Sequence, residues 1–274
     1  MKNLSYRHKH YAIKLLDLNT RDGSPTQSVS GAFTGDLRKS SLGNTLLGKK
    51  QFKAQKSPKS VTKQCEGGDR IFLNKKLIVV DAPGFLDTDI QEETIKKEIS
   101  KSYQVAAPGP HVFLLVLNLD RFTEQEKKAI KWLNHIFGPE AVDYCIVIFT
   151  GLDTLVEEER TIEQFIGDDP ELDSCIKTCG NRYMAINNKA TGNDQDVQVK
   201  TLLDKISAMV LKNGGQCYTN DGFQEVATEV EKEIQKTNGG FQPIKPDGTI
   251  NLLPQTEKIV DGFLRRSIGR RDMF

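Results

Sequence analysis

The stretch Leu77–Phe85 reads Leu-Ile-Val-Val-Asp-Ala-Pro-Gly-Phe, an apolar run that ends in an aspartate and, three residues later, a glycine. The apolar run predicts a buried strand, so Asp81 and Gly84 fall just beyond its carboxyl end. A carboxylate there can hold Mg²⁺ through water, and a glycine lets a backbone N–H approach a terminal phosphate closely. Because Asp and Gly also dominate ordinary turns, a simple turn stays open as the alternative for this segment.

Strand and helix signals alternate on both sides of this stretch. Arg70–Leu73 and Leu77–Val80 flank a short turn and predict a hairpin. Further apolar strands are expected at His111–Leu119, Tyr144–Thr150 and Arg182–Asn187. Strands that alternate with helices predict an α/β fold with a mostly parallel sheet flanked by helices. Ligands of such sheets bind beyond the carboxyl ends of the strands, so the residues that follow each strand are the candidates for a site.

Two of the later strand ends carry polar side chains. The segment Thr150–Asp153 reads Thr-Gly-Leu-Asp, and a carboxylate at Asp153 can accept hydrogen bonds from the N1–H and 2-amino group of guanine. Adenine lacks this pair of donors. The loop after the last strand offers Asn187 and Asn188, whose amides can lie near the guanine O6. The alternatives are an Asp-capped turn in the first place and an ordinary polar loop in the second.

A Lys-Ser pair, Lys39 and Ser40, stands at the start of a predicted helix. Such a pair can place an ammonium group on the β- and γ-phosphates and a hydroxyl on Mg²⁺, while the helix N-terminus faces the phosphates. Thr62 lies in the loop before the hairpin, where a threonine can ligate Mg²⁺ and sense the γ-phosphate. Without the other motifs, the simpler interpretation of Thr62 is a threonine in an irregular loop.

Together these segments follow the order and spacing of GTPase motifs. From Lys39 to Ile234 the chain resembles the GIMAP/IAN (immune-associated nucleotide-binding, AIG-type) family of septin-like P-loop GTPases. The segments that carry the resemblance include SVTKQC (60–65), VVDAPGFLDTD (79–89), IFTGLDTL (148–155) and CGNRYMAINNKA (179–190). The stretch Pro108–Gly138 is similar to a box peculiar to that family.

The resemblance implies a Ras-like P-loop GTPase fold with a C-terminal helical extension, GTP or GDP with Mg²⁺ as cofactors, and slow or partner-dependent hydrolysis. It also implies a nucleotide-controlled switch, a homodimer formed through the nucleotide face, a cytoplasmic location and an immune role. The nucleotide-binding residues that it implies are Lys39, Ser40, Ser41, Thr62, Asp81, Gly84, Thr150, Asp153, Asn187 and Asn188. Of these, Ser40, Thr62 and Asp81 are the expected Mg²⁺ ligands.

The phosphate loop departs from the pattern G-x-x-x-x-G-K-[ST]. Counting back from Lys39, the two glycine positions hold Phe33 and Arg38, and side chains there crowd the phosphates and resist positive φ. The apolar strand Tyr11–Leu18 ends well before Lys39 instead of running into the loop. Phe85 stands where Ras-like GTPases carry a water-positioning glutamine. Whether the chain is an enzyme therefore stays open, and a nucleotide-free pseudo-GTPase that acts as an interaction module is the alternative function.

Composition sets the remaining expectations. The 38 Lys and Arg nearly cancel the 37 Asp and Glu, so no global field favours nucleic acid or an anionic membrane. The apolar runs are far shorter than the roughly 20 residues that span a bilayer. The five cysteines are scattered, which fits reduced thiols. We expect a divergent segment at 1–38, the nucleotide-binding domain at 39–215, a helix at 216–237 and a flexible tail at 238–274.

Overall fold

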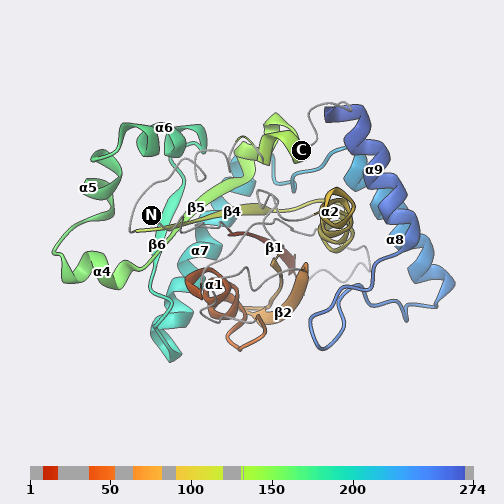
Figure 1. Ribbon diagram of the computed structural model, residues 1–274. Helices are drawn as coiled ribbons and strands as arrows, with labels where there is room; N and C mark the ends of the chain where they lie inside the picture. Colours follow the sequence, from red (N-terminus) through yellow and green to blue (C-terminus); the bar gives the residue numbers. More distant parts are fainter. Residues whose placement is uncertain are drawn as a thin grey trace.

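The computed structural model describes residues 9–17, 37–52, 64–81, 91–119, 131 and 133–268. Its centre is a six-stranded sheet with the order β2-β3-β1-β4-β5-β6, and helices lie on both faces (Figure 1). The strands are β1 (Lys9–Asp17), β2 (Glu66–Phe72), β3 (Lys75–Asp81), β4 (Val112–Asn118), β5 (Cys145–Thr150) and β6 (Tyr183–Ile186). The helices are α1 (Leu37–Leu47), α2 (Glu92–Ala106), the 3₁₀ helix η1 (Pro139–Tyr144), α4 (Leu152–Glu157), α5 (Ile162–Gly167), α6 (Pro170–Thr178), α7 (Gly192–Lys212), α8 (Asp221–Lys236) and α9 (Pro254–Ile268).

Four of the six strands run in one direction. β4 pairs in parallel with β5, and β5 with β6. β3 and β4 are both antiparallel to β1, so they run parallel to each other. β2 is antiparallel to β3, and the two form the predicted hairpin. Its turn residues Leu73 and Asn74 have φ of 48° and 59°, the left-handed pair that matches the twist of a tight hairpin. The predicted α/β class is confirmed.

The central strand β1 runs against both of its neighbours. Tyr11 lies opposite Asp81 and Asp17 lies opposite Lys75, so β1 ends at the edge of the sheet where β3 begins. A strand that feeds a phosphate loop ends at the opposite edge, because the phosphates bind where the parallel strands end. The direction of β1 therefore adds to the departure from the phosphate-loop pattern that the sequence shows at Phe33 and Arg38.

Both faces of the sheet are buried, which explains why β4 is apolar at successive positions. On one face Leu114 of β4 belongs to the same buried cluster as Leu42 of α1 and Ile206 of α7. On the other face Phe113 shares a cluster with Val260 of α9. None of the helices in the described residues is long and apolar enough to cross a membrane.

The C-terminal region differs from the flexible tail that we predicted for 238–274. Within it, α9 packs against α2 and α8 (Figure 1), and Leu264 is buried. Gln104 of α2 donates to the Asn251 carbonyl and accepts the Leu253 N–H, each at 2.7 Å. The tail prediction is therefore wrong for the described residues up to Ile268. The prediction failed because the Gly-Gly and Pro residues before α9 were given more weight than the short amphipathic pattern of that helix.

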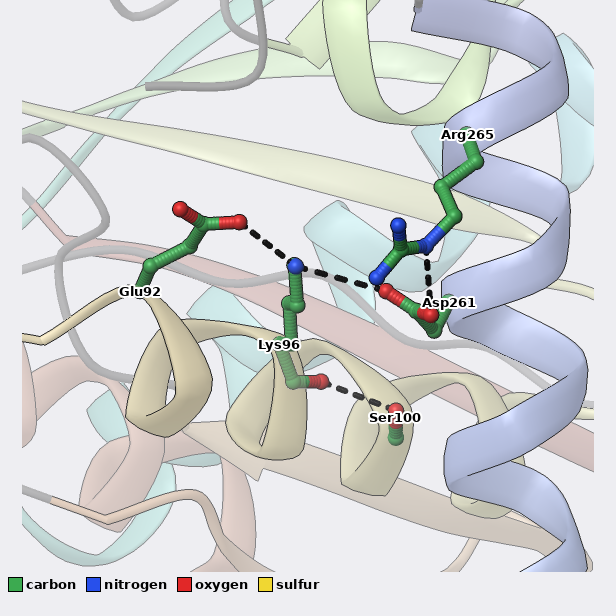
Figure 2. Close-up of polar contacts among 5 residues, drawn as sticks. All are labelled: Glu92, Lys96, Ser100, Asp261 and Arg265. Carbon is green, nitrogen blue, oxygen red and sulfur yellow. Dashed lines mark hydrogen bonds and ion pairs between the residues drawn. The ribbon is translucent and has the colours of Figure 1, made fainter. Parts of the chain in front are cut away.

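A polar cluster also links α2 to α9 (Figure 2). Lys96 Nζ lies 2.5 Å from Glu92 Oε1 and 3.3 Å from Asp261 Oδ1, and Arg265 Nε lies 2.7 Å from Asp261 Oδ2. Ser100 Oγ donates to the Lys96 carbonyl on α2. The hydrogen bond to Glu92 raises the pKa of Lys96. Burial opposes ionisation of Asp261, but hydrogen bonds from Arg265 and Lys96 outweigh it and lower the pKa of Asp261.

Replacing Asp261 with asparagine is expected to lower the free energy of unfolding at pH 7 by about 1 kcal/mol, since its ion pairs with Lys96 and Arg265 are partly exposed and therefore partly screened. The folded pKa of Asp261 lies below its unfolded value. Its charge therefore stabilises the fold above about pH 4, and that contribution is lost as the pH falls through the folded pKa. Urea unfolding at pH 7 and pH 3 measures this effect. The gap between wild type and D261N should shrink at pH 3, and an equal gap at both values contradicts the prediction.

Candidate functional site

The carboxyl ends of β3, β5 and β6 lie at one edge of the sheet, because these strands run in the same direction. Asp81 is the last residue of β3 and Thr150 the last of β5, while Asn187 and Asn188 follow β6 directly. Four residues that the sequence singled out at the ends of three separate strands are therefore at the same edge. This is the edge at which ligands of such sheets bind.

Asp81 is fully buried at the end of an apolar strand. A carboxylate is rarely buried unless it is paired, hydrogen-bonded or bound to a metal. Together with the hydroxyls of Ser40 and Thr62, this carboxylate would give an all-oxygen ligand set, which suits Mg²⁺. The residues predicted from the sequence thus fit Mg²⁺ in their chemistry, and Asp81 fits it in its position.

Helix α1 begins at Leu37, so Lys39 and Ser40 lie in its first turn, as the sequence predicted. The free N–H groups and the dipole of a helix N-terminus favour an anion there. Leu42 and Leu46, both fully buried, hold α1 against the sheet. Ser41 is half-buried. Arg38, the position of the second loop glycine, is also part of this helix.

Asp153 lies in the first turn of the short helix α4, which follows Gly151 with φ of 98°. Its Oδ2 lies 2.5 Å from Nζ of Lys189, a residue of the loop after β6. The Asp153 side chain is one quarter exposed and the Lys189 side chain is mostly exposed. The segments after β5 and β6 therefore meet, and they bring the carboxylate expected to read guanine next to an exposed ammonium group.

Thr150 lies at the predicted strand end, but its side chain has a partner inside the protein. It is fully buried, and its hydroxyl donates to the Leu117 carbonyl of β4 at 3.2 Å. We therefore expect Thr150 to hold β4 and β5 together beneath the Asp153 segment, because its hydroxyl already has an internal acceptor.

The loop after β6 is fixed by contacts that the sequence did not indicate. Gln198 of α7 accepts the Asn187 N–H at 2.8 Å and donates to the Asn187 carbonyl at 3.2 Å. Asn188 Oδ1 accepts a hydrogen bond from Thr45 of α1 at 3.2 Å, and Gln195 of α7 donates to the Thr45 carbonyl. Hydrogen bonds thus connect helix α1, the loop after β6 and α7 at this edge of the sheet. These partners lie far apart in the sequence, so no local sequence pattern indicates that they are in contact.

Several predicted residues fall outside what the structure describes. Thr62 and Gly84 lie outside the described residues, as do Phe33 and Phe85. The backbone of Lys39 and Ser40 is described as helical, but their side chains are not. Their roles stay predictions.

Comparison with known proteins identifies the family. Residues 34–238 match the family model described as the AIG1 family. The chain belongs to the AIG1 family. It is 36% identical over 211 residues to immune-associated nucleotide-binding protein 9 of Arabidopsis thaliana, a match that covers 73% of this chain and 62% of the relative. It is 33% identical over 233 residues to GTPase IMAP family member 8 of Homo sapiens, covering 78% of this chain and 35% of the relative.

The match thus spans less than two thirds of the length of these curated AIG1 relatives. Among solved structures, Toc33 from Arabidopsis thaliana in complex with GDP and Mg²⁺ is similar, with a TM-score of 0.50 and 19% identity. That likeness covers 66% of this chain and 82% of the Toc33 chain, and it shows that the two chains share an α/β fold. The family match begins at residue 34, so the reversed strand β1 lies outside it.

Proposed function

We propose that this AIG1 chain binds GTP and GDP with Mg²⁺ and acts as a nucleotide-controlled switch. The observation that supports this most is the meeting of the β5 and β6 segments, where Asp153 and Asn188 lie at the sheet edge that also carries Asp81. Toc33, which is similar in fold, holds GDP and Mg²⁺ in its solved structure. The relatives in the family are themselves called nucleotide-binding proteins.

In this proposal Asp153 selects the base. Its carboxylate accepts the N1–H and 2-amino protons of guanine, and where Lys189 covers Oδ2 the base would displace it. An exposed ion pair of this kind contributes about 0.2–1 kcal/mol, so guanine displaces it at little cost. Adenine presents no such donors to a carboxylate, and the specificity for guanine follows.

The phosphates would lie over the N-terminus of α1. Backbone N–H groups of its first turn and the Lys39 ammonium would bind them, and Ser41 would contact the α-phosphate. Asp81, Ser40 and Thr62 would hold Mg²⁺, which neutralises phosphate charge when bound. A phenylalanine at position 85 cannot orient water, so hydrolysis is slow or depends on a partner. Dimerisation through the nucleotide face, a cytoplasmic location and an immune role are proposed from the family resemblance.

Nucleotide binding is tested by thermal unfolding of the full chain with GTP, GDP or ATP, each with Mg²⁺ or with EDTA. We expect GTP and GDP with Mg²⁺ to bind with micromolar or tighter affinity. At a concentration 100 times the dissociation constant they would stabilise the fold by about 2.7 kcal/mol. ATP should leave the unfolding temperature unchanged. Equal effects of GTP and ATP would refute the role of Asp153 in base selection.

A second candidate is a nucleotide-free pseudo-GTPase that acts as an interaction module. The reversed direction of β1 favours it, since β1 ends at the sheet edge opposite Asp81. Under this alternative, no guanine nucleotide shifts the unfolding temperature of the unmodified chain. Binding would return only when glycines replace Phe33 and Arg38 and a strand of the correct direction precedes them.

A further inference from the structure

Helix α2 carries a buried carboxylate that none of the proposed nucleotide contacts uses. The Glu98 side chain is 4% exposed and forms an ion pair with Lys101, with Nζ and Oε1 2.8 Å apart. Its second oxygen, Oε2, accepts the backbone N–H of Cys65. A buried carboxylate is tolerated only with such partners. Burial and then the Glu98 charge raise the pKa of the Cys65 thiol.

The two ends of this contact follow, along the chain, the two segments expected to sense the γ-phosphate, and both ends lie within the described residues. Cys65 follows Thr62 by three residues and leads into β2. Glu98 belongs to α2, the first described helix after the segment that carries Asp81 and Gly84. One hydrogen bond therefore joins the segment after Thr62 to the helix after Gly84.

One side of this contact faces a cavity. The cavity, of about 660 Å³, opens between α2 and residues 250–257, and its wall includes Gln64, Glu98 and Lys101. Space, rather than packed side chains, adjoins Gln64 on that side. Farther along α2, Gln104 instead holds the segment that leads into α9. The buried polar groups of α2 thus serve two different connections.

We propose that Glu98 is a positioning residue that couples the Thr62 segment to α2, so that both loops respond together to the terminal phosphate. This inference rests on the proposed function. GTP carries the γ-phosphate that the two loops would sense, and GDP does not. Coupling between the loops therefore favours GTP, and its loss should weaken GTP binding while leaving GDP binding nearly unchanged.

The test compares Glu98→Ala with Glu98→Gln and Gln104→Ala, using a non-hydrolysable GTP analogue and GDP. For E98A we expect about a tenfold loss of analogue affinity, within the usual range of coupling between sites, and less than a twofold change for GDP. E98Q keeps an acceptor for the Cys65 N–H and should restore most of the analogue-to-GDP ratio. Q104A alters a buried residue of the same helix and should leave that ratio unchanged. Equal losses for both nucleotides in E98A would overturn the proposal.

Hydrogen exchange of the nucleotide-free chain separates this inference from the proposed function. E98A should speed exchange at the Cys65 amide and in the first turns of α2, around Ile95, and Q104A should do so much less. If wild type binds neither nucleotide, the proposed function fails, and exchange alone decides the coupling. Unchanged exchange at Cys65 in E98A would then overturn the inference.

Discussion

Replacing Asp153 with asparagine is expected to lower the affinity for GTP and GDP by about 10²-fold. The carboxylate offers an acceptor to each of two guanine donors, whereas the amide keeps one acceptor and turns an N–H₂ group toward the other donor. Each hydrogen bond to a charged group is worth about 1.5–3 kcal/mol. Loss of one such bond, with the other donor now facing a repulsive N–H₂ group, accounts for the expected change.

The same substitution should also raise the affinity for a different base, a result that general disruption of the site cannot produce. Xanthine carries an oxygen where guanine has its 2-amino group, and this oxygen can accept from the new amide. We therefore expect D153N to bind xanthosine triphosphate more tightly than wild type does. Asp173→Asn is a matched control, because Asp173 is a partly exposed carboxylate of α6 that pairs with Lys177 at 2.6 Å. Titration calorimetry with both triphosphates measures the effect. Unchanged GTP affinity in D153N would remove Asp153 from the base site.

Residues of the parallel strands were the most predictable part of this fold. The run Leu77–Val80 is apolar because β3 is covered on both faces, and that pattern placed Asp81 at a strand end. The direction of β1 was not predictable, since a strand has the same alternation of side chains in either direction. Its place between β3 and β4 depends on pairing with residues far along the chain.

The candidate site was likewise predictable only where a residue's position follows from the local sequence pattern. A strand end followed by an aspartate marked Asp153, because the loop position follows from the local pattern. The contact of Asp153 with Lys189 joins residues from two separate loops, and the bond between Thr45 and Asn188 joins a helix to a distant loop. The hydroxyl of Thr150 faces Leu117, a direction that depends on strand packing. Such long-range geometry leaves no local trace in the sequence.

Replacing Phe223 with alanine is expected to lower the free energy of unfolding by about 3–5 kcal/mol, as for other buried aromatic residues. Phe223 of α8 is fully buried. Its ring stacks on that of Tyr103 of α2, with centroids 4.1 Å apart, and lies 6.1 Å from that of Phe137. Tyr103 also contacts the ring of Phe263 in α9. The substitution therefore opens a cavity where α2, α8 and α9 meet.

Ile234→Ala is the matched control, since Ile234 lies on the same helix and is 39% exposed. It should change the free energy of unfolding by less than about 1 kcal/mol, because little apolar area leaves contact. Thermal unfolding should show a drop of about 10 °C for F223A, given 2–4 °C per kcal/mol in a chain of this size. One cooperative transition at the lower temperature would mean that α8 and α9 unfold together with the sheet. Equal, small effects of F223A and the Ile234 variant would instead mean that the C-terminal helices contribute little to the stability of the nucleotide-binding domain.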